Sequence, residues 1–332
     1  MKYFYSYYSC NQKSNEDLFF MAMCIKLSST LLKKMNKTVG IYSDSKFIEL
    51  LKKYEVDLNF YENIEDEIKN IQTKKLFAVC KLYSNIIQSE PFIQIDTDLF
   101  LFDNLDFNLL ETSLISFYSL ETISWTSPPE HYFGWKLNYL DLYNIFSEKF
   151  PHIVQHQYTN PLYAYNCAIV GGLDWKIYKE IYEPMFKLIK DNKTFVENLG
   201  DYPMLVLEQH IITGHLAKLG YNLSNINFVS QNRLPYIEPT DTNFFFKVNE
   251  KNEPLLTLDN NGFFECHPNK IKELVKEKFS GSIHLQGAKG LIGIRNLIYE
   301  MLRYYNPNYV NWLEKKFGKE YQFQKNIINS LI

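Results

Sequence analysis

The sequence lacks a long hydrophobic run, an excess of basic residues and a paired cysteine motif. No apolar segment reaches the length of about 18 residues that a membrane-spanning helix needs, and the first residues lack the apolar core of a signal peptide. The five cysteines form no Cys-x-x-Cys pair, which favours reduced, buried thiols. The formal net charge of -3, with scattered positive residues, excludes a broad nucleic-acid-binding face. We therefore expect a cytoplasmic protein that neither crosses a membrane nor binds nucleic acid.

The rest of the composition is that of a large globular chain. Of the 332 residues, 46% are hydrophobic and 22% are charged, so the chain can bury a sizeable core. No internal repeat or low-complexity linker divides it. One elaborated α/β unit is the expected organisation.

Strand-like and helix-like segments alternate through the first hundred residues. Such alternation predicts an α/β fold with a mostly parallel sheet and helices on both faces, and ligands bind beyond the carboxyl ends of such strands. Asn15 is the expected N-cap of the first helix. The expected strands are residues 2–8, 38–42, 57–61 and 92–95, and the expected helices are residues 16–35, 45–54 and 75–88.

The second half of the chain has a less regular pattern. Residues 122–135 read as a loop with two prolines and two tryptophans. The expected strands are residues 114–118, 163–172 and 282–286, and the expected helices are residues 137–150, 175–190, 202–219, 291–303 and 310–317.

Two carboxylates, Asp96 and Asp98, interrupt an otherwise apolar run at the end of the strand expected at 92–95. Burying an unpaired carboxylate is costly, so a partner must offset the cost. Side chains two positions apart on an extended strand share one face, and we predict that Asp96 and Asp98 close on one hard divalent cation. The alternative is a turn in which Asp98 caps a helix and Asp96 faces water. That alternative does not explain the apolar residues on both sides.

Four further motifs accompany the Asp-x-Asp pair. They are Lys75-Leu76 before the metal strand, Tyr165-Asn166-Cys167-Ala168-Ile169-Val170, Glu208-Gln209, and Ile283-His284-Leu285-Gln286-Gly287-Ala288-Lys289. In this order they resemble the nucleotide-sugar glycosyltransferases of the GT-A fold, most closely the family 8 type that includes glycogenin and bacterial galactosyl- and glucosyltransferases. The resemblance covers roughly residues 1–295.

The resemblance implies a domain plan. A single catalytic domain over residues 1–290 contains a nucleotide-binding half at 1–112 and an acceptor half at 113–290. Its fold is a Rossmann-like, mostly parallel sheet flanked by helices. A C-terminal helical segment at 291–332 packs on this domain.

The resemblance also implies a site. Asp96, Asp98 and His284 bind Mn²⁺ or Mg²⁺, and an imidazole ligand favours Mn²⁺. Lys289 meets the diphosphate of a nucleotide sugar, UDP-linked by the resemblance. It lies five residues after His284 and precedes Gly290-Leu291, whereas the family spacing is six and Pro-Trp follows. The resemblance assigns catalysis to Asp96, Asp98, Gln209 and Lys289, and donor binding to Lys75, Asp96, Asn166, Gly287 and Lys289.

Read without the family, three of these residues keep an ordinary structural alternative. His284 can instead be a hydrogen-bonded residue of the core, and Gln209 can be a solvated position on a helix. Asn166 can be a residue that pins a turn. His210 stands where the family often has a second acid.

The implied activity is a metal-dependent hexosyltransferase that acts with retention on a saccharide, lipid-linked or protein acceptor. The alternative is a catalytically inactive carbohydrate-binding or interaction protein on the same fold. A sugar-phosphate nucleotidyltransferase normally has a glycine-rich loop after its first strand, and residues 6–11 contain no glycine.

Aromatic residues suggest two contact surfaces. Trp125, Tyr132 and Trp135 are candidates to stack on an acceptor sugar, with packing under a loop as the alternative. Residues 303–319 mix aromatic and basic side chains, as helices at membrane interfaces do. Peripheral contact with the inner face of a membrane is therefore one expectation for the C-terminal helices, and folding onto the domain is the other.

Overall fold

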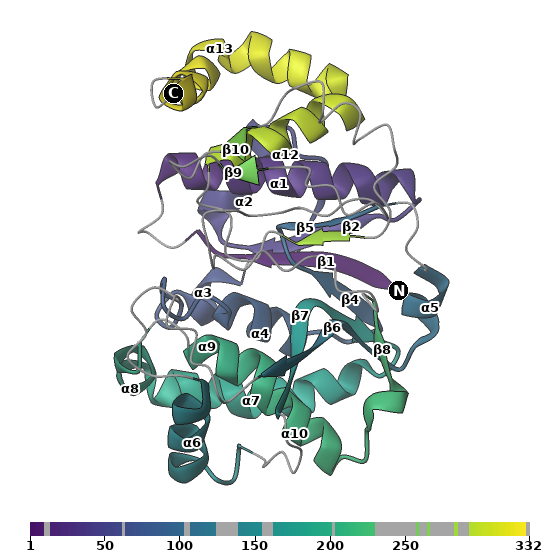
Figure 1. Cartoon of the computed structure of the whole chain (residues 1–332), viewed down its shortest axis with the longest axis vertical. Coiled ribbons are helices and arrows are strands. Elements are labelled where there is room, and N and C mark those ends of the chain that lie inside the picture. Colours follow the sequence, from purple (N-terminus) through teal and green to yellow (C-terminus); the bar gives the residue numbers. More distant parts are fainter. Residues whose placement is uncertain are drawn as a thin grey trace.

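A seven-stranded sheet with the strand order β3-β2-β1-β4-β7-β6-β8 forms the centre of the computed structural model (Figure 1). β7 runs antiparallel to both of its neighbours, and the other neighbouring strands are parallel. The prediction of an α/β fold with a mostly parallel sheet flanked by helices is confirmed. The strands are β1 (Lys2–Tyr7), β2 (Val39–Ser43), β3 (Asn59–Phe60), β4 (Phe92–Ile95), β6 (Ile115–Ile123), β7 (Leu162–Gly172) and β8 (Ile226–Phe228). The structure describes residues 1–9, 14–61, 64–102, 107–123, 139–154, 162–200, 203–229, 257–258, 264–265, 282–284 and 292–329.

One face of the sheet is covered by the N-terminal and C-terminal helices (Figure 1). Tyr3, Tyr5 and Tyr7 alternate along β1 and pack against these helices in one apolar cluster. The first helix is capped by Ser14, whose Oγ accepts a hydrogen bond from the backbone N–H of Asp17 at 3.1 Å, so the prediction of Asn15 as N-cap is wrong by one residue. The helices on this face are α1 (Asn15–Lys34), α2 (Ser45–Lys53), α12 (Ile292–Tyr305) and α13 (Pro307–Asn329).

The opposite face carries α4 (Val79–Ile86), α7 (Trp175–Asp191) and α10 (Ile211–Lys218). Phe4 and Phe92, from neighbouring strands, belong to the apolar cluster on this side. The main helices on both faces agree with the sequence pattern, although α4 begins at Val79 rather than at residue 75. The shorter helical segments are α3 (Glu65–Ile68), α5 (Phe107–Thr112), α6 (Tyr139–Lys149), α8 (Lys193–Asn198), α9 (Pro203–Leu205), a π-helical turn at Val206–His210 and a 3-10 turn at Leu223–Asn225.

Two small antiparallel pairs lie outside the main sheet. β9 (Thr257–Leu258) pairs with β10 (Phe264–Glu265). β5 (Leu99–Leu101) pairs with β11 (Ser282–His284), so a segment near the end of the chain meets the chain just after Asp98. β5 was not predicted, because its apolar residues continue the pattern of β4.

The C-terminal helices are held by specific contacts with the N-terminal third. Arg295 binds Asp17 of α1 at 2.8 Å, and the hydroxyl of Tyr309 donates to the backbone carbonyl of Tyr54 at 2.6 Å. The ring of Phe317 packs edge-on against that of Tyr54. Within the described part of the chain, no helix is long and apolar enough to cross a membrane.

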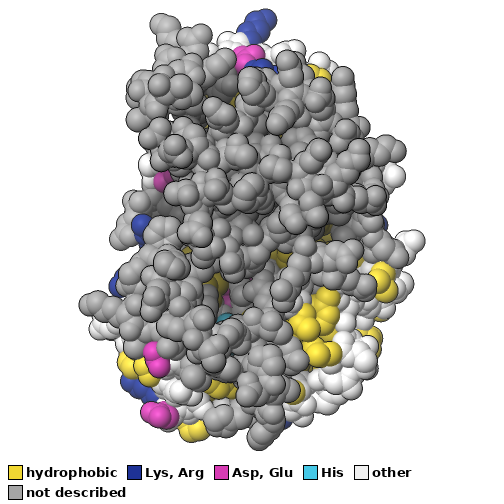
Figure 2. Space-filling view, viewed as in Figure 1, with side chains coloured by type: hydrophobic (Ala, Val, Ile, Leu, Met, Phe, Trp, Pro, Cys, Tyr) yellow, Lys and Arg dark blue, Asp and Glu magenta, His cyan; other side chains and the backbone are white. Residues whose placement is uncertain are grey.

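The described residues leave few charged side chains visible on one face of the molecule (Figure 2). On the face shown in Figure 2, the visible lysine, arginine and acidic side chains of the described residues form no large patch of one sign. This agrees with the scattered charge of the sequence. The predicted acceptor aromatics Trp125, Tyr132 and Trp135 lie outside the described residues.

Candidate functional site

The Asp96-Thr97-Asp98 segment forms a turn between β4 and β5. The backbone N–H of Leu99 donates to the carbonyl of Asp96 at 3.1 Å, and the N–H of Asp96 donates to the carbonyl of Ala168 at 2.8 Å. Asp98 is buried, with 2% exposure, and the Asp96 side chain is 26% exposed. The predicted strand end at residue 95 is confirmed, but the premise that the two carboxylates share one face of an extended strand is wrong. They instead belong to a turn beyond the carboxyl end of β4, where ligands of such sheets bind.

Lys81 of α4 connects three elements around this turn. Its Nζ lies 2.7 Å from Oδ1 of Asp96 and 2.7 Å from Oε1 of Glu208, and it also donates to the backbone carbonyl of Cys167. Burial alone would lower the pKa of Lys81, but the charges of Asp96 and Glu208 outweigh burial and raise the pKa above its ordinary value. Lys81 is therefore a permanent buried cation between two carboxylates.

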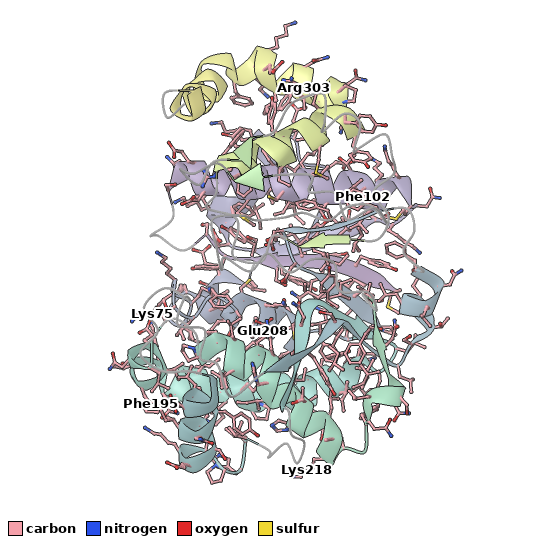
Figure 3. All side chains as sticks on the ribbon, in the orientation of Figure 1. Lys75, Phe102, Phe195, Glu208, Lys218 and Arg303 are labelled. Carbon is pink, nitrogen blue, oxygen red and sulfur yellow. The ribbon has the colours of Figure 1, made fainter. Side chains whose placement is uncertain are left out.

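Glu208 is presented by an unusual turn of helix. Residues Val206–His210 form a π-helical turn between α9 and α10, within the helix expected at 202–219. Such turns are rare and occur often at functional sites. Glu208 is buried and lies near the centre of the molecule (Figure 3), whereas Gln209 is partly exposed. Burial raises the pKa of Glu208, the charge of Lys81 opposes this rise, and the charge of Asp96 adds to it.

An irregularity in β7 brings its backbone to Lys81. The β6 partner of Val170 is Phe117 and that of Asn166 is Ser119, so β7 carries extra residues between these pairs. Oδ1 of Asn166 accepts a hydrogen bond from the N–H of Ala168 at 3.0 Å. This contact is the one expected of a residue that pins a turn, and the carbonyl of the intervening Cys167 faces Lys81.

Lys75, expected at the donor site, is exposed and lies before α4. Its Nζ donates to the backbone carbonyl of Glu197 at 3.0 Å, and Figure 3 shows it near α8 and apart from Glu208. The lysine that meets the Asp-x-Asp turn is Lys81. Its signal in the sequence is that Lys81-Leu82 repeats Lys75-Leu76 six residues later, at helical spacing from the buried Ser84 and Asn85.

His284 reaches the turn through its backbone. In the β5–β11 pair it is the partner of Leu99, the residue that follows Asp98. The described part of His284 is its backbone, and Gly287 and Lys289 lie outside the described residues. Among the side chains that the structure describes, no group of three His, Cys, Asp or Glu residues is close enough to hold a metal ion.

The donor chemistry of the turn fits a hard divalent cation. Asp96 and Asp98 offer carboxylate oxygens within one turn, which are the ligands that Mg²⁺ and Mn²⁺ prefer. The backbone pairing adds a histidine position beside them. The residues present therefore fit Mn²⁺ or Mg²⁺.

Solved structures with a similar course of the chain include three glycosyltransferase structures. Mouse xyloside xylosyltransferase 1, in its apo form, is 11% identical over 68% of this chain and 84% of its own, with a TM-score of 0.35. The galactosyltransferase LgtC, in complex with donor and acceptor sugar analogs, is 12% identical over 69% of this chain and 73% of its own, with a TM-score of 0.35. An active-site mutant of LgtC is 12% identical over 69% of this chain and 72% of its own, with a TM-score of 0.36. These scores are too low to assign an activity.

Comparison with curated proteins gives no match. A family model does match, over residues 11–255, which include β4, the Asp-x-Asp turn, β7 and the π-helical turn. Its description is "Family of unknown function (DUF6734)". The chain belongs to this family.

Proposed function

We propose that the protein is a metal-dependent glycosyltransferase that moves a hexose, with retention, from a UDP-linked sugar to a saccharide, lipid-linked or protein acceptor. The observation that carries this proposal is the convergence at the Asp-x-Asp turn. Beyond the end of β4, Asp96 pairs with the buried cation Lys81, Asp98 is buried two residues later, and Leu99, the next residue, pairs with the backbone of His284. This is the arrangement expected where a diphosphate leaving group must be bound and its charge stabilised.

In this proposal, Asp96, Asp98 and His284 hold the cation. When bound, Mn²⁺ or Mg²⁺ supplies positive charge for the diphosphate leaving group. Lys289 and Gly287 follow His284 closely in the chain and contact the same diphosphate. Because the carboxylates of Asp96 and Asp98 would offset part of the charge of the ion, Lys289 would add positive charge for the diphosphate.

Lys81 has the donor-site role that the sequence suggested for Lys75. It binds Asp96 at 2.7 Å and so orients that carboxylate. Its second partner, Glu208, precedes Gln209, which contacts the transferred sugar near the anomeric carbon in this proposal. Asn166 contributes by fixing the turn of β7 that directs the carbonyl of Cys167 to Lys81.

Nucleotide release from a donor panel tests the proposal. The purified protein is incubated with UDP-, GDP- and CMP-sugars and Mn²⁺, without acceptor, and free nucleotide is measured. We expect slow, metal-dependent release from one or two donors, because the leaving group is stabilised and water replaces the acceptor.

Matched variants make this test specific. Asp98→Asn removes a buried carboxylate of the turn and should abolish release. Asp66→Asn removes an exposed carboxylate paired with Lys69 and should leave release unchanged. If no donor gives release above that of Asp98→Asn, the transferase proposal fails. Sugar binding without release would favour the inactive carbohydrate-binding protein.

A further inference from the structure

The turn that carries Asp96 and Asp98 is fastened from the face opposite to Lys81 by a hydroxyl group. Ser28 of α1 is completely buried, and its Oγ donates to the backbone carbonyl of Leu99 at 2.8 Å. The N–H of the same Leu99 closes the turn on the carbonyl of Asp96. Ser28 is distant from Leu99 in the chain, so this bond fixes the turn to the core.

The hydroxyl of Ser28 is itself oriented by Tyr5. The phenol of Tyr5, in β1, donates to Oγ of Ser28 at 2.9 Å, and Tyr5 is completely buried. Burial raises the pKa of Tyr5 above its ordinary value, so the phenol keeps its proton and remains the donor. Since Ser28 accepts from Tyr5, its single proton is directed to Leu99. The relay runs from the central strand through α1 to the turn.

Leu99 is the residue at which both parts of the proposed cation site join. It follows Asp98 directly, and it is the backbone partner of His284 in the β5–β11 pair. A shift of the Leu99 peptide would therefore move the carboxylates relative to the histidine position. Cation affinity depends on such outer contacts, because they hold the ligands in place.

We infer that Ser28 is a positioning residue for cation and nucleotide binding, with Tyr5 as its orienting partner. The inference rests on the proposed function for the identity of the ligands. It gives the helix α1 a part in the site through the backbone of Leu99.

The neighbouring residue supplies a matched control. Ser29 lies on the same helix, is 7% exposed, and its Oγ donates to the carbonyl of Lys26 at 3.0 Å. That bond stays within α1. Ser28→Ala and Ser29→Ala therefore remove the same atom from adjacent buried positions, and only the first releases the turn.

The experiment compares Ser28→Ala, Tyr5→Phe and Ser29→Ala with the unaltered protein. Mn²⁺ affinity is measured by calorimetry in the presence of UDP, hydrogen exchange is followed in the peptide covering residues 96–101, and melting temperature is recorded. We expect Mn²⁺ affinity to fall about tenfold or more in Ser28→Ala and less in Tyr5→Phe. Ser29→Ala should bind Mn²⁺ as the unaltered protein does. Exchange in the turn should rise in Ser28→Ala and not in Ser29→Ala.

The outcomes separate this inference from the proposed function. If Ser28→Ala matches Ser29→Ala in both Mn²⁺ affinity and turn exchange, the positioning role is overturned, whatever the melting temperatures are. If exchange rises only in Ser28→Ala but the unaltered protein binds neither Mn²⁺ nor UDP, the anchor is supported and the proposed function fails, and with it the role of Ser28 in cation binding.

Discussion

The helices α1 and α4 cover opposite faces of the same sheet and contact the Asp-x-Asp turn through different kinds of polar group. Buried α1 is mainly apolar, and Ser28 gives the Asp-x-Asp turn a neutral hydrogen bond. Buried α4 brings the charge of Lys81 to the same turn, and its Ser84 and Asn85 also face the sheet. The turn is thus held from both sides, by an uncharged contact on one face and by an ion pair on the other.

The polar side of α4 continues beyond the site. The hydroxyls of Ser84 and Ser6 are hydrogen-bonded, and Nδ2 of Asn85 donates to Oε1 of Gln94 at 2.8 Å. Buried polar networks cost desolvation and depend on every partner, whereas apolar packing is less specific. We therefore expect the α4 face to be the more sensitive of the two to substitution.

The largest expected effect comes from removing the buried cation. Lys81→Met leaves Asp96 and Glu208 close together in the interior without their counter-charge. We expect a loss of about 3 to 5 kcal/mol in the free energy of unfolding, as for other broken buried ion pairs. Urea denaturation at neutral pH measures it.

An exposed ion pair provides the control for this substitution. Lys187 lies 2.5 Å from Asp191, and its side chain is 75% exposed. Lys187→Met should cost less than about 1 kcal/mol, because exposed pairs contribute little. If the two variants lose the same stability, the ion pair of the α4 face has no special role.

A comparable effect, spread over several pH units, is expected from pH through His210 on the same face. His210 is 3% exposed, and burial lowers its pKa from 6.5 to about 3. Between these values the unfolded chain binds a proton that the folded chain does not. His210 therefore does not lower the free energy of unfolding above pH 6.5. Below pH 6.5 it lowers that free energy by up to about 1.4 kcal/mol for each pH unit.

Replacing the imidazole tests this linkage. Between pH 6.5 and pH 4, the free energy of unfolding of His210→Gln should fall less steeply with falling pH than that of the unaltered protein. The difference in slope should correspond to the uptake of nearly one proton on unfolding. Urea denaturation over a pH series gives both slopes. Equal slopes would show that His210 is protonated in the folded state or accessible to water.

The sequence predicted the parts of this molecule that depend on local pattern. The end of β4, the strands β2 and β7 and the helix α7 follow from alternating polarity and turn residues, so their positions were close to those observed. The placement of Asp96 and Asp98 beyond a strand end followed from the same reasoning. Their turn geometry did not, because three residues after a strand can continue it or leave it with nearly equal local preference.

The parts that were missed depend on contacts between distant segments. The sequence signal of Lys81 is weak, and its role becomes apparent only when the fold brings Glu208 and Asp96 to it. The π-helical turn has no reliable sequence signal, and Ser28 gains its role only from its bond to Leu99. The motif order predicted that distant segments meet at the Asp-x-Asp turn, but it could not predict which atoms make the contacts.

The most direct test of the account is the melting temperature of the protein with UDP, with Mn²⁺ and with both. Ligands that bind only the folded state raise its stability with the logarithm of their concentration relative to Kd, so two ligands that tighten each other's binding at a shared site give the full effect only together. The account predicts a clear rise with both ligands, little rise with either alone, and no rise in Asp98→Asn. A rise with UDP alone equal to that with both ligands, or a full rise in folded Asp98→Asn, would contradict a cation site at the turn between α1 and α4.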